Sequence, residues 1–157
     1  MTIDVRAGER DEAAADRAFV TELGRRCAMS SVGLQRPAPE ANVRAAFDRL
    51  CDLVESQSHV TLIARRDGER VGFLMLLDDL PDEVTLMPQG FVAYMAVEPD
   101  ARREGIGSAL LAAAEDEARR RGLPYMSLMV TEDNEAARRL YEGGGYQTER
   151  RLLCKTL

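Results

Sequence analysis

The chain has 157 residues, of which 45% are hydrophobic and 31% charged, a balance typical of one globular domain that buries its own core. Its formal net charge is −6, which disfavours DNA or RNA as a partner, because nucleic-acid binding normally needs a basic surface. No apolar run approaches the ~18 residues that a membrane span requires.

The first 55 residues predict one strand and two helices. Residues 2–6 (TIDVR) alternate between apolar and polar side chains, as a short strand does. Residues 10–29 and 40–55 carry apolar side chains at helical spacing. Two prolines within residues 33–39 mark a break between these helices.

In the middle of the chain the apolar pattern changes to that of strands. The segments 59–65 (HVTLIAR) and 71–77 (VGFLMLL) flank Asp67-Gly68, a dipeptide typical of β-hairpin turns. An acidic loop follows at residues 78–83, and residues 90–97 predict a further strand.

The last third of the chain alternates between helices and strands. The pattern predicts a helix at 105–121, a strand at 125–130 and a helix at 135–142. Two short apolar stretches within residues 146–157 predict final strands. The resulting order, β-α-α-β-β-β-α-β-α-β-β, predicts a single α/β domain spanning residues 1–157, with a mixed sheet flanked by helices.

The cysteine and histidine content suggests where the protein works. Cys27, Cys51 and Cys154 are an odd and widely spaced set, which argues against a disulfide framework and favours a reducing cytoplasm. With His59 as the one histidine and no C-x-x-C motif, we expect no metal site. The first 16 residues lack the apolar centre of a signal peptide, so we expect none.

The turn between the predicted strand at 90–97 and the following helix carries the strongest functional signal. Its glycines, Gly105 and Gly107, let a ligand approach the backbone where free N–H groups of a helix start favour an anion. No lysine follows either glycine, which excludes the P-loop, and Leu110 stands where a dinucleotide fingerprint needs Gly or Ala. The alternative is a helix start whose glycines only allow close packing.

Arg102-x-x-Gly105-x-Gly107 fits the (Q/R)-x-x-G-x-(G/A) turn of the GNAT superfamily of N-acetyltransferases at every position. A second segment resembles the next motif of that family, N-x-x-A-x-x-x-Y-x-x-x-G-(F/Y). In this chain it runs from Asn134 through Ala137 and Tyr141 to Tyr146. The resemblance covers about residues 58–150, and the first 55 residues match in element order alone.

This resemblance implies acetyl-coenzyme A as the donor, with no metal. It implies that the turn cradles the pyrophosphate and that the pantetheine arm lies between the strands at 90–97 and 125–130. It also implies Tyr141 as the general acid that protonates the departing thiolate, since a phenol with a pKa near ~10 can protonate a thiolate whose thiol has a pKa near ~8.5. The residues expected to bind the coenzyme are Met95, Ala96, Val97, Arg102, Arg103, Gly105, Ile106, Gly107, Ser108, Asn134 and Ala137.

The general base is not identified by the sequence. Many relatives carry a glutamate in the strand before the phosphate turn, whereas residues 91–96 (FVAYMA) contain no carboxylate. The candidates are Glu83, Asp82, Asp79 and His59, and loss of the proton to solvent is the alternative.

Three classes of function remain open. The leading hypothesis is an N-acetyltransferase acting on a small amine, with a protein N-terminus or a lysine as the alternative acceptor. The second is a non-catalytic acyl-coenzyme A sensor on the same fold, and the third is an unrelated α/β interaction domain. The expected partners are acetyl-coenzyme A and an amine acceptor. Members of the family often form dimers, and no interface is assigned from the sequence.

Overall fold

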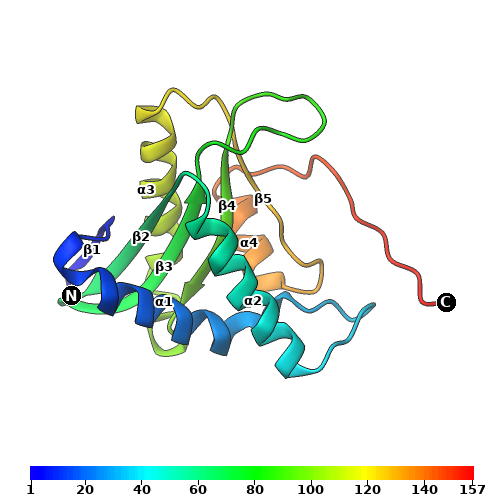
Figure 1. Cartoon of the computed structure of the whole chain (residues 1–157), viewed down its shortest axis with the longest axis horizontal. Coiled ribbons are helices and arrows are strands. Elements are labelled where there is room, and N and C mark those ends of the chain that lie inside the picture. Colours follow the sequence, from blue (N-terminus) through cyan, green and yellow to red (C-terminus); the bar gives the residue numbers. More distant parts are fainter.

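A five-stranded sheet in the order β1-β2-β3-β4-β5 forms the centre of the computed structural model, which describes residues 1–157 (Figure 1). The first four strands pair antiparallel and β5 pairs parallel with β4. The predicted α/β class with a mixed sheet is therefore confirmed. The strands are β1 (Ile3–Ala7), β2 (His59–Arg66), β3 (Glu69–Leu77), β4 (Gly90–Val97) and β5 (Met126–Leu128).

Four α-helices cover the two faces of this sheet (Figure 1). Three short 3₁₀ turns extend the first helix and open the turn after β4. No helix combines the length and the apolar character that crossing a membrane requires. The helices are α1 (Ala13–Cys27), α2 (Glu40–Glu55), α3 (Ile106–Arg120) and α4 (Glu135–Gly143), and the 3₁₀ turns are η1 (Arg10–Glu12), η2 (Ala28–Ser31) and η3 (Pro99–Ala101).

The β2–β3 hairpin forms as its turn sequence predicts. Asp67 and Gly68 both have positive φ angles, 51° and 88°, which a tight two-residue hairpin turn requires. The Asp67 side chain also accepts a hydrogen bond from the Thr2 backbone N–H at 2.8 Å, which fixes the start of β1 beside the turn. This hairpin supplies the central strand β3 and its neighbour β2.

The core has two halves, one on each face of the sheet. On one face α1 and α2 contribute Leu23, Phe47 and Val54, all buried, against Phe73 of β3. On the other face α3 contributes four buried residues, Ile106, Leu110, Leu111 and Ala114. Strand β3 is buried from Val71 to Leu77 because helices cover it on both sides.

The expected final strands at 146–157 do not form, which corrects the predicted element order at its end. No backbone–backbone hydrogen bond involves residues 147–157, and the segment runs away from the sheet (Figure 1). A bidentate ion pair between Arg150 and Asp82, at 2.8 and 2.9 Å, holds the start of this segment at the β3–β4 loop. An apolar strand pattern needs a neighbouring strand edge, and on this path the segment has none.

Gly24 lets α1 and α2 approach each other, and we expect Gly24→Ala to destabilise the fold. A Cβ atom at Gly24 would lie 1.9 Å from Cζ of the Phe47 ring, so the helices must move apart. Overpacking of this kind costs about 1–3 kcal/mol. Thermal unfolding followed by circular dichroism should show a lower Tm.

The matched control is Gly143→Ala in α4, where a Cβ atom meets nothing within 4 Å. Alanine favours a helix over glycine, so this variant should unfold at or slightly above the wild-type Tm. Equal Tm values for the two variants would contradict the packing role of Gly24.

Candidate functional site

Strands β4 and β5 separate after three residue pairs, which opens a gap in the sheet. The pairs are Gly90–Met126, Phe91–Ser127 and Val92–Leu128. Beyond them, residues 93–97 of β4 keep β3 as a neighbour on one side and have no strand partner on the other. Three of the expected coenzyme-binding residues, Met95, Ala96 and Val97, lie along this free edge.

The turn after β4 ends in a helix start with unused N–H groups. Arg103 and Gly105 have positive φ angles, 65° and 82°, which curve the backbone before α3 begins. The N–H groups of residues 105–108 donate to no acceptor within the protein, and the first bond of the helix runs from Ala109 N–H to the Gly105 carbonyl. Four aligned N–H groups and the positive end of the α3 dipole make this turn a candidate anion site.

Ion pairs attach both sides of this turn to the rest of the domain. Arg26 at the end of α1 binds the Glu98 carboxylate through two hydrogen bonds of 2.6 and 3.1 Å. Arg66 at the end of β2 binds the Glu104 carboxylate through two more, at 2.9 and 3.1 Å. The Arg26–Glu98 pair is bidentate and the Arg66 Nη1 group contacts both Glu104 oxygens, so both sides of the turn are held in place within the protein.

The two arginines of the turn differ in what they contact. The Arg102 guanidinium donates to the Val97 carbonyl at 3.3 Å and lies 3.7 Å from the Cys27 Sγ, so it points back toward the end of β4. Arg103 is exposed and forms no ion pair or hydrogen bond through its side chain. Of the two, Arg103 is the one whose charge is free for an anion at the turn.

The two glycines of the motif also differ in their surroundings. A Cβ atom at Gly105 would meet nothing within 4 Å, so this position borders open space. A Cβ atom at Gly107 would lie 2.9 Å from the Leu140 side chain of α4. Gly107 therefore permits close packing of α3 and α4. Of the neighbouring motif residues, Ile106 is buried in the core and Ser108 is exposed.

Helix α4 begins at Asn134, whose side chain has structural partners. Its Oδ1 accepts a hydrogen bond from the Ala137 backbone N–H at 3.2 Å and thereby caps the helix. Its Nδ2 donates to the Ser30 carbonyl at 3.5 Å, across to η2. The motif asparagine thus fixes where α4 starts and links it to the segment between α1 and α2.

Tyr141 lies two turns along α4, half-buried against the α3 side of the core. Its ring meets that of Tyr146 edge to face, with centroids 6.1 Å apart. Its hydroxyl forms no hydrogen bond within the protein. Burial, and to a smaller extent the neighbouring Tyr94 phenol, raise the pKa of Tyr141, so this phenol keeps its proton at neutral pH.

Tyr94 was missed by the sequence reasoning, which searched this strand for a carboxylate. Its ring packs between Phe47 and Phe73 on the α1–α2 face, with centroids 5.0 and 6.1 Å away. Burial raises the pKa of Tyr94, and its hydroxyl lies near Ser31 of η2. A tyrosine within an apolar strand is typical of a core residue. Its position beside the gap depends on the separation of β4 and β5, which the sequence does not reveal.

The segment after β5 contacts η2 and the residues that follow η2. The Thr131 hydroxyl donates to the Ser31 carbonyl at 2.7 Å, and the Asp133 carboxylate accepts from the Leu34 N–H at 2.8 Å. These contacts join segments about a hundred residues apart in sequence, which no local pattern reveals.

The four candidates for the general base lie at the other end of the sheet. Asp79, Asp82 and Glu83 belong to the loop that enters β4, and His59 begins β2 beside the end of β3. The anion site follows the opposite end of β4. The Arg150 guanidinium and the Thr85 hydroxyl and N–H hold the pKa of Asp82 well below its usual range, which makes that carboxylate a poor base.

Comparisons with known proteins identify relatives of this arrangement. The model of the acetyltransferase (GNAT) family matches residues 31–146. An uncharacterized N-acetyltransferase, YhfO, of Bacillus subtilis is 34% identical over 96 residues, which span 61% of this chain and 64% of that protein. The match therefore covers somewhat less than two thirds of that curated relative's length.

Solved structures agree over the whole chain. A putative acetyl transferase from Pyrococcus furiosus has a TM-score of 0.81 at 25% identity, covering 99% of this chain and 100% of that one. A ribosomal-protein-alanine N-acetyltransferase from Brucella melitensis has a TM-score of 0.69 at 23% identity, with full coverage of both chains. AAC(6')-Iy in complex with a bisubstrate analog, CoA-S-monomethyl-acetylneamine, has a TM-score of 0.69 at 17% identity, covering 100% and 99%. The last two likenesses concern the fold.

Among the three free cysteines, Cys51 lacks the surroundings of an activated nucleophile. Cys27 and Cys51 are half-buried and Cys154 is exposed. Burial, together with the carboxylates of Asp48, Glu55 and Asp52, raises the pKa of Cys51 to about 11. A reactive thiol needs the opposite environment, because the thiolate is the nucleophile.

We expect Cys51 to resist alkylation in the folded protein. With a pKa of about 11 its thiolate stays scarce until the pH nears that value, whereas an exposed cysteine ionises near pH ~8.5. Iodoacetamide labelling at pH 8 followed by peptide mass spectrometry should modify Cys154 first. In denaturant the two sites should react at similar rates, and fast native labelling of Cys51 would contradict the raised pKa.

Proposed function

Since the chain belongs to the acetyltransferase (GNAT) family, we propose that it transfers acetyl from acetyl-coenzyme A directly to a primary amine of a small molecule. The observation that carries this proposal is the helix start with four unused N–H groups at the mouth of the β4–β5 gap. An anion site beside an open strand edge suits a ligand with a phosphate head and an amide-bearing arm. Coenzyme A has both.

The donor would be held by backbone groups. Residues 105–108 would bind the pyrophosphate through their N–H groups, with Arg103 adding charge from outside. The free edge of β4 at residues 95–97 would bond the amides of the pantetheine arm as a neighbouring strand would. This assignment retains the expected turn residues and gives Arg102 and Asn134 supporting roles instead of direct contact.

Tyr141 would complete the transfer as the general acid. The amine lone pair attacks the thioester carbon, the carbon–sulfur bond breaks, and the thiolate takes the phenol proton. The free Tyr141 hydroxyl supports this role, because it forms no hydrogen bond within the protein and the phenol carries its proton at neutral pH. The amine proton leaves to solvent, since no carboxylate occupies residues 91–96, and solvent returns a proton to the Tyr141 phenolate.

The proposal includes a class of acceptor, cationic small amines, and a compartment, the cytoplasm. A net charge of −6 favours cationic amines near the protein, and three free thiols suit a reducing cytoplasm. The absence of a carboxylate in residues 91–96 favours one alternative, a non-catalytic acyl-coenzyme A sensor. Its distinguishing property is binding of the coenzyme without turnover.

A thiol-release assay with acetyl-coenzyme A tests the proposal across a panel of small amines, lysine peptides and peptides with free N-termini. Release that depends on a small amine supports it, and a preference for peptides would move the acceptor to proteins. Tight coenzyme binding with no release on any acceptor would favour the sensor.

Tyr141→Phe should lower kcat about 100-fold or more while the KM for acetyl-coenzyme A changes little, because the variant loses a proton donor and keeps the ring packing. Tyr146→Phe is the matched control, since that hydroxyl contacts Glu115 at 3.3 Å. Steady-state kinetics with the best amine of the panel measure both. Near-normal turnover in Tyr141→Phe would refute the assignment of Tyr141 as the general acid.

Gly105→Val should weaken coenzyme binding about tenfold or more, because a side chain there fills the open space next to the free N–H groups. Gly68→Val is the matched control, because Gly68 has a similar φ of 88° and equally open surroundings in the β2–β3 turn. Both variants bear the same backbone strain, so isothermal titration with coenzyme A isolates the loss at the anion site. Equal affinities in the two variants would refute that site.

A further inference from the structure

The Arg102 guanidinium carries a charge that no ion pair within the protein compensates. It donates to the Val97 carbonyl at 3.3 Å and lies 3.7 Å from the Cys27 Sγ, and both partners are uncharged groups. The carboxylates of the same turn are already engaged by Arg26 and Arg66; they are Glu98, Asp100 and Glu104. Arg102 is therefore available to a negatively charged group of a ligand.

The contacts of Arg102 place its guanidinium on the face of the sheet that α1 and α2 cover. Cys27 ends α1 and packs against the α1–α2 half of the core. Tyr94 belongs to the same half and lies within reach of the Arg102 charge. Burial raises the pKa of Tyr94, whereas the Ser31 hydroxyl and the Arg102 guanidinium act against that rise. Arg102 thus contacts the α1–α2 side and makes no contact with residues 105–108.

The two faces of the sheet have different tasks in the proposed function, and a tyrosine of each face lies near the gap. Tyr141 packs against the α3 half of the core and Tyr94 against the α1–α2 half. Burial, and to a smaller extent the Tyr94 phenol, raise the pKa of Tyr141, so the two phenols are neighbours. The candidate anion site lies at the start of α3, which assigns the α3 face to the donor. An acceptor then approaches from the Tyr94 side, where Arg102 lies.

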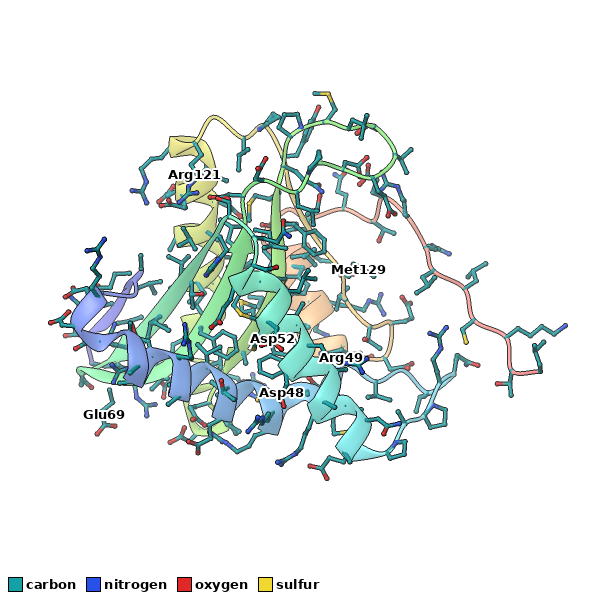
Figure 2. The ribbon with its side chains drawn as sticks, in the orientation of Figure 1. Asp48, Arg49, Asp52, Glu69, Arg121 and Met129 are labelled. Carbon is teal, nitrogen blue, oxygen red and sulfur yellow. The ribbon has the colours of Figure 1, made fainter.

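The segments on this acceptor side supply no free carboxylate. Residues 28–39, which follow α1, contain neither Asp nor Glu. In the segment after β5, the Asp133 carboxylate accepts a backbone N–H of residues 28–39 at 2.8 Å. Asp48 and Asp52, labelled in Figure 2, share a face of α2 that is not its buried face, and an arginine of α1 binds Asp48. An acceptor on this side therefore meets the positive charge of Arg102 without a competing protein carboxylate.

We propose that Arg102 binds a carboxylate of the acceptor, so that the acceptor is an amino acid and not a simple amine. This inference rests on the proposed function and narrows its class of acceptor. A guanidinium presents paired N–H donors that match the two oxygens of a carboxylate. The ammonium group of an amino acid still suits a protein of net charge −6, and its carboxylate fixes where the molecule binds.

Arg102 takes no part in the bonds that change during the transfer. With its carboxylate held, the amino acid forms a bond from its amine nitrogen to the thioester carbon, and the carbon–sulfur bond breaks. The thiolate takes the Tyr141 proton, the amine loses a proton to solvent, and solvent returns one to Tyr141. Arg102 is therefore a residue that determines specificity, and its loss should raise the KM for the acceptor more than it lowers kcat.

Matched sets of acceptors test the inference in the thiol-release assay. Each set contains a common amino acid, its decarboxylated amine and its amide, which keeps the shape of the acid and loses the charge. The amino acid of the best set should have a kcat/KM about tenfold or more above its two counterparts, because hydrogen bonds to a charged group are among the strong ones. Equal kcat/KM values within every set overturn the proposal.

Arg102→Gln tests the residue itself. Glutamine is the other residue that the family's turn accepts at this position, so the variant should keep the turn. It should lose the preference for the acid, while isothermal titration shows an unchanged Kd for coenzyme A. Arg102→Lys keeps the charge without the paired donors and should restore part of the preference.

Arg103→Gln is the matched control, because Arg103 is the exposed arginine next in the chain and is assigned to the donor. This variant should weaken the binding of coenzyme A and keep the preference for the acid. If Arg102→Gln instead weakens the binding of coenzyme A and keeps the preference, Arg102 serves the donor and the proposal is wrong.

Binding measurements separate this inference from the proposed function. If no amine releases thiol, the proposed function fails, and titration of amino acids into the complex with coenzyme A decides the inference by itself. Binding that the wild-type protein shows and Arg102→Gln loses supports the carboxylate site. Absence of binding by every amino acid of the panel, or equal binding by both proteins, overturns it.

Discussion

The parallel pairing of β4 with β5 stops after Val92 and Leu128, and much of the molecule is organised around that separation. Where two neighbouring strands part, each keeps a row of backbone donors and acceptors that the protein itself leaves unpaired. Along β4 this row lies within residues 93–97, with the Val97 carbonyl bound by Arg102, and leads straight into the turn before α3. The open edge and the anion site are therefore parts of one continuous surface.

The surroundings of the gap are built to keep it open. Arg26 and Arg66 bind carboxylates on the two sides of the turn, and Asn134 fixes the start of α4 while contacting η2. The helices on both faces bury the central strands, so the sheet resists closing where the two strands part. Apart from Asn134, the side chains that hold this geometry lie outside the motif residues.

Strands β4 and β5 differ in how firmly the rest of the protein holds them. Strand β4 is continuous with the core, whereas β5 is three residues long and has an exposed outer edge. Residues 146–157, which have an apolar pattern typical of strands, form no strand beside it.

The sequence alone determined most of the element types and pointed to a candidate anion site, because these depend on local chemistry. Periodicity placed the helices and the β2–β3 hairpin, and the spacing of Arg102, Gly105 and Gly107 indicated the candidate anion site. Tertiary structure decided what those residues do. Gly107 accommodates Leu140, and Arg102 turns back to Val97, since both depend on segments distant in sequence. Residues 146–157 show the same limit, because an apolar pattern indicates a preference for a strand and a strand forms only beside another strand edge.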